Sequence, residues 1–143
     1  MSAFFDALPL LLKIGAAGQF AVAVLNLCLV RLLHWKKVLE PLPLLLREVF
    51  QVHVWFITIT LAVFATVTWR FADVIATDTI GRWLAGGISL FWGIRTVIQV
   101  CYYSHSHWVG KTRETTIHIT LLLAYGGLAV VYGLTAWGGA FVR

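Results

Sequence analysis

The stretch Leu90–Ile98, LFWGIRTVI, places an arginine in the middle of an apolar run. It belongs to a longer segment, Trp83–Tyr103, which as a helix is long enough to cross the roughly 30 Å hydrocarbon core of a membrane. An arginine at the centre of such a helix costs at least about 2.5–3.5 kcal/mol on insertion, so its side chain normally faces protein, water or a ligand. The stretch therefore predicts a transmembrane helix with a polar inner side.

Three further segments have the same length and apolar character. The chain has 143 residues, of which 60% are hydrophobic and 12% charged, whereas soluble domains carry about 25% charged residues. We predict an all-α, polytopic integral membrane protein: a single domain, 1–143, folded as an antiparallel bundle of four transmembrane helices. The predicted spans are approximately Leu10–Leu33, Val49–Trp69, Trp83–Tyr103 and Thr116–Trp137.

The connection between the first two spans contains two prolines, Pro41 and Pro43, which break any continuous helix. The short apolar segment Leu42–Leu46 is expected to lie along the membrane surface before the second span enters.

Basic residues flank the apolar runs and do not form one patch, so the net charge of +5 does not point to nucleic-acid binding. Lysine and arginine are enriched on the cytoplasmic side of membrane proteins. The first and third connections hold six of them, and the opposite side holds four. This bias predicts that both termini lie on the non-cytoplasmic side of the membrane, which we expect to be a bacterial inner membrane. The two groups are Arg31, Lys36, Lys37, Arg47, Lys111 and Arg113, against Lys13, Arg70, Arg82 and Arg143.

Polar residues recur at helical spacing in every predicted span. Positions i and i+7 share a helix face because seven residues make about two turns. Each span has one polar line, and we expect the four lines to face the inside of the bundle. The lines are Gln19 with Asn26, His53 with Thr60, His118 with Tyr125 and Tyr132, and, at i+4 spacing, Arg95 with Gln99.

Two histidines in these lines, His53 and His118, are expected at similar depth in the membrane. A b-type haem needs two imidazoles facing each other from different helices, and Arg95 and Gln99 are polar partners for a haem propionate or a quinone. The alternative is that these side chains only bond across helices and hold the bundle together.

Two more histidines, His105 and His107, lie in the third connection and form a His-x-His pair that is a possible metal site. The alternative is that they are ordinary interfacial residues beside Trp108. The sequence contains no Gly-x-Ser-x-Gly elbow, no phosphate-binding glycine loop and no His-Glu-x-x-His motif, so it gives no indication of an enzyme.

The segment Phe91–Tyr103, FWGIRTVIQVCYY, follows a span that begins near Arg47-Glu48-Val49-Phe50. These two features resemble small, uncharacterised bacterial membrane proteins with four helices. The resemblance implies the fold and the membrane location, and it implies no activity.

Three functions fit these features. The first is an accessory, assembly or binding subunit without catalysis of its own, held in a larger membrane complex by a membrane-protein partner or by further copies of itself. The second is a redox protein that binds haem or quinone through His53 and His118, with Arg95 and Gln99 beside them. The third is a small transporter or lipid-handling protein that uses the polar lines as a pathway.

Overall fold

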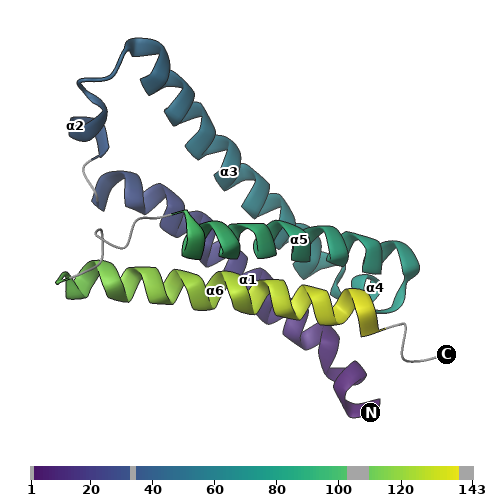
Figure 1. Ribbon diagram of the computed structural model, residues 1–143. Coiled ribbons are helices and arrows are strands. Elements are labelled where there is room, and N and C mark those ends of the chain that lie inside the picture. Colours follow the sequence, from purple (N-terminus) through teal and green to yellow (C-terminus); the bar gives the residue numbers. More distant parts are fainter. Residues whose placement is uncertain (1, 33–34, 103–109, 139–143) are drawn as a thin grey trace.

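The computed structural model describes residues 2–32, 35–102 and 110–138, and all regular elements within these ranges are helices (Figure 1). Four of them are long and apolar enough to cross a membrane. The prediction of an all-α chain with four such helices is therefore confirmed. The elements are α1 (Ser2–Leu32), α2 (Trp35–Leu39), α3 (Leu44–Arg70), α4 (Ala72–Thr77), α5 (Thr79–Cys101) and α6 (Thr112–Gly138).

The prolines act where the sequence predicted. Helix α2 ends at Leu39, and Pro43 stands directly before the first residue of α3. A proline fits this position because the first backbone N–H groups of a helix have no intrahelical acceptor. In the segment Leu42–Leu46, α3 already begins at Leu44. Its expected place along the membrane surface stays a prediction.

The short helix α4 was not predicted. It follows α3 directly and is followed by α5, whose first turn is capped by the Asp78 carboxylate accepting a 2.8 Å hydrogen bond from the Ile80 N–H. The start of α5 lies so close to α4 that a Cβ on Gly81 would stand 2.5 Å from Ile75 Cα. A glycine is therefore required at this contact.

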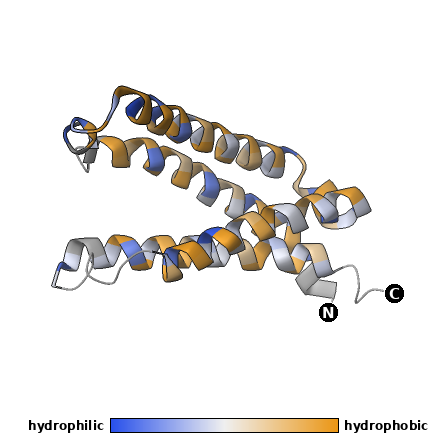
Figure 2. Ribbon diagram, turned by 45° about the horizontal axis from the view of Figure 1, so that its top comes forward, coloured by the Kyte–Doolittle hydropathy of each residue, from blue (hydrophilic) through white to orange (hydrophobic). Residues whose placement is uncertain are grey.

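The long helices are arranged as two pairs (Figure 1). Helix α1 packs along α3, and α5 packs along α6, with the two helices of each pair running in opposite directions. The pairs meet near α4, where α1 contacts both α4 and α6. Toward the α2 end the pairs move apart, as Figure 2 also shows. A single four-helix antiparallel bundle is therefore not confirmed.

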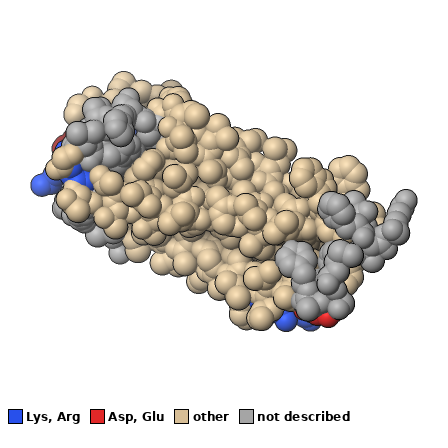
Figure 3. All heavy atoms as spheres, turned by 60° about the horizontal axis from the view of Figure 1, so that its bottom comes forward, with Lys and Arg blue, Asp and Glu red and all other residues tan. Residues whose placement is uncertain are grey.

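The buried core lies where the two pairs cross. Its largest fully buried side chains come from every helix that meets there, and they include Leu12, Ile75, Ile88, Trp92 and Tyr132. Elsewhere the helices carry large apolar side chains on their outer faces. Lys, Arg, Asp and Glu atoms gather at the two ends of the face drawn in Figure 3, and the long middle of that face is uncharged. This distribution is typical of helices that cross an apolar layer.

Candidate functional site

The predicted polar lines do not meet in one place but divide into three clusters. The first cluster joins α1, α3 and α6 at the crossing of the two pairs. The Tyr132 hydroxyl donates a 2.7 Å hydrogen bond to Thr68 Oγ1 and accepts one from Gln19 Nε2. All three side chains are buried. This network ties the two helix pairs together.

The second cluster ties α1 to α3. Asn26 Nδ2 donates to Thr58 Oγ1 at 2.9 Å and to the Val54 carbonyl at 3.2 Å. Asn26 and Gln19 share one side of α1, as the spacing predicted, but they bind different partner helices. Both residues thus hold helices together.

The third cluster lies between α5 and α6. Gln99 Nε2 is 2.9 Å from His118 Nδ1, and because an amide N–H only donates, the imidazole nitrogen accepts. The Arg95 guanidinium lies over the Tyr125 ring, 5.0 Å from its centroid, in a cation–π contact. Gln99 is 3% exposed, and its Oε1 is buried without a hydrogen-bond partner in the described part of the chain. Arg95, Gln99 and His118, three of the predicted cofactor-binding residues, therefore contribute to one cluster between α5 and α6.

His53 belongs to none of these clusters. It is exposed on α3, next to Val52 and Phe56, which are 62% and 71% exposed. The side of α3 that faces the rest of the molecule carries Thr58 and Leu61. His53 therefore points away from the other helices, and the predicted partners His53 and His118 lie in different surroundings.

A cavity of about 230 Å³ lies between the two helix pairs. Asn26 and Arg95 supply its polar wall, and Trp92 stacks on Tyr125 with the ring centroids 5.2 Å apart. A small ligand with a carbonyl or anionic group fits this chemistry, since a guanidinium is a strong donor to such oxygens. The lining residues are Val22, Leu25, Asn26, Leu29, Ile57, Leu61, Phe91, Trp92, Arg95, Leu121 and Tyr125.

The predicted metal ligands His105 and His107 lie outside the described residues. Within residues 2–32, 35–102 and 110–138, no group of three or more His, Cys, Asp or Glu side chains is placed to hold a metal ion. The metal pair therefore stays a prediction from sequence.

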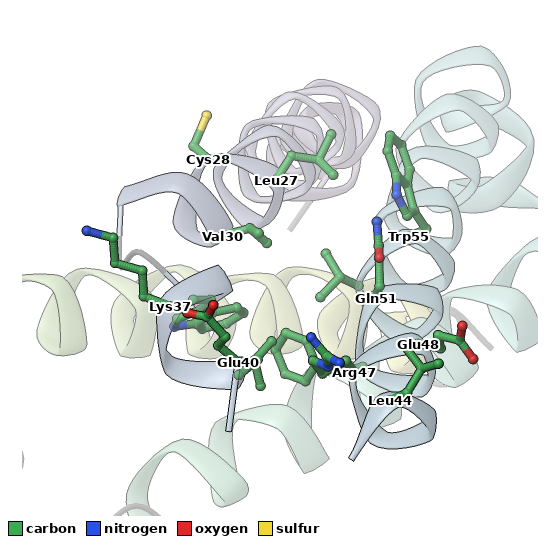
Figure 4. A pocket seen from close by; sticks show the side chains of 14 residues that line it. Leu27, Cys28, Val30, Lys37, Glu40, Leu44, Arg47, Glu48, Gln51 and Trp55 are labelled. Carbon is green, nitrogen blue, oxygen red and sulfur yellow. The ribbon is translucent and has the colours of Figure 1, made fainter. Parts of the chain in front are cut away.

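The sequence analysis missed a second and larger cavity, of about 870 Å³, between the end of α1, the short helix α2 and the start of α3 (Figure 4). Of its charged residues, Lys37 and Arg47 entered the prediction only through the topology. The charged residues include Glu40 and Arg47, which come from either side of the two prolines. The sequence does contain an indication of this cavity: basic and acidic residues alternate on both sides of the two prolines, and such a mixture is compatible with a charged rim around a cavity.

Comparison of the chain with protein-family models, with curated proteins and with solved structures gave no match in any of the three.

Proposed function

We propose that this chain is an integral membrane protein that acts as a non-catalytic accessory or assembly subunit of a larger membrane complex. Its four long apolar helices and the uncharged middle of the face drawn in Figure 3 support insertion into a bilayer. Its buried polar side chains bond mainly from helix to helix, as in Gln19–Tyr132–Thr68 and Asn26–Thr58, which supports a structural use of these groups.

One observation supports the proposal most: His53 is exposed on the outer side of α3, one of the four helices that are long and apolar enough to cross a membrane. It lies about 14 Å along α3 from Leu44, at about 1.5 Å per residue, among side chains that would contact lipid. Ionisable residues in membrane spans almost always face protein or a water-filled space. Only 17% of the apolar window of α3 is buried inside the molecule, against 33% for α1. The outer face of α3 is therefore the place where a partner would cover His53.

The partner we propose is a different membrane protein, not a second copy of the chain. Two copies in one membrane have the same orientation, so a two-fold dimer through α3 would set His53 against His53. A different subunit can instead offer His53 a carboxylate or a carbonyl, and such a hydrogen bond is stronger when the acceptor is charged.

The test is site-specific photo-cross-linking in the native membrane. A benzoylphenylalanine replaces Phe56, which neighbours His53, or Leu123 on α6 as the matched control, because both side chains are 71% exposed. We expect an adduct with one membrane protein from position 56 and none from position 123. His53→Leu should reduce the position-56 adduct at least about tenfold, the equivalent of one charge-assisted hydrogen bond.

Each other outcome would contradict the proposal. An adduct of twice the 16.0 kDa chain mass would replace the different subunit with a homo-oligomer. Cross-links to lipid alone from both positions would leave α3 facing the bilayer and remove the argument for a partner.

The orientation is part of the same proposal. We place the α2 end of the molecule in the cytoplasm and both termini on the other side of a bacterial inner membrane. The bias of Lys and Arg toward the two predicted cytoplasmic connections supports this orientation. Reporter fusions test it: a cytoplasm-active reporter at the C-terminus should be inactive, and a periplasm-active one should be active.

A second candidate function, binding of a quinone, is favoured by the cavity beside Arg95. The guanidinium would donate to a quinone carbonyl, and the ring would lie against Trp92 and Tyr125. A short-chain ubiquinone titrated into the purified protein should quench tryptophan fluorescence, less in Trp92→Phe and at about tenfold higher concentration in Arg95→Leu. Equal quenching in all three proteins would reject the site. A Soret band lost in His53→Ala and His118→Ala would favour haem instead.

A further inference from the structure

The recess between α1, α2 and α3 combines an apolar floor with a charged rim (Figure 4). The floor is formed by Leu27 and Val30 of α1 and by Val54 of α3. The Trp35 ring packs edge-on against Phe50, with 5.0 Å between the ring centroids. A tryptophan in such a position is typical of the boundary between membrane and water.

The rim carries two basic and two acidic side chains, Lys37, Arg47, Glu40 and Glu48. In Figure 4, Glu40 and Arg47 extend into the space between α2 and α3, whereas Lys37 and Glu48 point away from it. Arg47 Nε is buried and has no hydrogen-bond partner in the described part of the chain. A buried donor without a partner is costly, so an acceptor from outside the chain would be bound favourably there.

The position of the recess identifies the kind of ligand. The recess lies where the candidate spanning segment of α1 ends, at Val30, and where that of α3 begins, at Leu44. If these helices span a bilayer, as proposed above, the recess extends from the lipid headgroups, at the level of Arg47, to the first part of the acyl chains, at the level of Val54. Its volume of about 870 Å³ suits a headgroup with the first part of an acyl chain.

We infer that this recess binds one phospholipid of the membrane, with Arg47 holding the phosphate and Glu40 holding the ammonium of an ethanolamine headgroup. A guanidinium pairs well with phosphate oxygens. A primary ammonium donates hydrogen bonds to a carboxylate, which the trimethylammonium of phosphatidylcholine cannot do. The two described charged side chains that extend into the recess, Arg47 and Glu40, have opposite signs, so a headgroup that carries both charges matches them better than a purely anionic one.

This inference depends on the proposed membrane insertion but not on a protein partner. Alkaline carbonate washing separates the two failures. If the wash strips the chain from membranes, the membrane assignment itself is wrong. If the chain stays in the membrane but shows no lipid preference, only the recess site is wrong.

The experiment is native mass spectrometry of the purified chain, delipidated and then supplied with phosphatidylethanolamine, phosphatidylcholine or phosphatidylglycerol of matched acyl chains. The variants are Arg47→Gln and Glu40→Gln. Arg70→Gln and Asp73→Asn at the other end of the molecule are the controls, because both residues are exposed and lie outside the recess.

We expect one retained phosphatidylethanolamine per chain, bound about tenfold or more tightly than phosphatidylcholine. Glu40→Gln should lower the affinity for phosphatidylethanolamine to that for phosphatidylcholine, while the affinity for phosphatidylcholine stays the same and shows that the fold is intact. Arg47→Gln should weaken binding of all three lipids, and the two controls should change none.

Three results would overturn the inference. The first is equal retention of the three lipids by the unaltered chain. The second is an equal loss of binding in Arg47→Gln and Arg70→Gln. The third is competition by millimolar inorganic phosphate that displaces phosphatidylethanolamine completely, which would assign the recess to a free phosphate.

Discussion

The replacement Tyr132→Phe tests whether the buried polar network holds the two helix pairs together. The hydroxyl it removes is the shared atom of two hydrogen bonds, one accepted from Gln19 Nε2 and one donated to Thr68 Oγ1. Phenylalanine keeps the ring of a side chain that is 0% exposed, so packing is preserved. The variant therefore changes the polar contacts and little else.

The size of the effect follows from the number of bonds. Hydrogen bonds between membrane helices average about 0.6 kcal/mol and reach about 1.7 kcal/mol, so the loss of two predicts a destabilisation of about 1–3 kcal/mol. The upper part of this range is expected because Gln19 already has one buried atom, Oε1, without a partner in the described part of the chain. Removing the hydroxyl would leave its amide nitrogen without this acceptor as well.

The assay is a double-mutant cycle of Tyr132→Phe and Thr68→Val, with the free energy of unfolding measured by denaturant titration in detergent micelles. We expect a coupling energy of about 0.6–1.7 kcal/mol between the two positions. Thr66→Val is the control, because the Thr66 hydroxyl bonds only to the Ala62 carbonyl of its own helix. A coupling energy within about 0.2 kcal/mol of zero would refute the role given to this network.

Other replacements test packing and the remaining clusters by the same unfolding measurement. Gly81→Ala should destabilise the chain by about 3 kcal/mol or more, because the new Cβ would meet backbone atoms at 2.5 Å. Gly87→Ala is the control: a Cβ there would have nothing within 4 Å, so the change should be neutral or up to about 1 kcal/mol stabilising. An equal effect at the two glycines would contradict the close contact of α4 and α5. Asn26→Ala should cost about 1 kcal/mol through two lost bonds to α3, and no loss would show that α1 and α3 pair without them. Gln99→Leu should change the free energy of unfolding by less than about 1 kcal/mol, because two effects oppose each other. The loss of the hydrogen bond to His118 destabilises the chain, and the loss of a buried acceptor without a partner, Gln99 Oε1, stabilises it. A loss of more than about 2 kcal/mol would contradict this expectation.

The four long apolar helices could be predicted from the sequence because they depend on local properties. An apolar run of sufficient length forms a helix wherever backbone groups lack water, and Pro41 and Pro43, which lack N–H donors, lie in the break between α2 and α3. Helical spacing also identified which residues share a side: Gln19 with Asn26 on α1, and Tyr125 with Tyr132 on α6. These relations hold within one helix and need no knowledge of its neighbours.

The orientation of whole helices could not be predicted in the same way. His53 and Thr60 form a polar line on α3, yet the Thr60 hydroxyl bonds to the Phe56 carbonyl of its own helix and His53 faces outward. The helix turns the side with Thr58 and Leu61 toward α1, because Asn26 bonds to Thr58 there. Rotation is decided by such contacts between helices, and a single sequence does not show which helices will pair.

The polar side chains of this protein form two groups: those with a hydrogen-bond partner on another helix, and those for which the described part of the chain shows no such partner. Gln19, Asn26 and Tyr132 bond to other helices, and such groups explain why the helices associate. His53 on the outer face of α3 and Arg47 Nε in the recess lie apart from those networks. Since an apolar surrounding gives polar atoms no water to bind, groups of the second kind are stable only with a ligand or a neighbouring protein. We therefore relate the first group to the fold, and the second to the partner and the lipid proposed above, whose sites would lie on different sides of the same helix, α3.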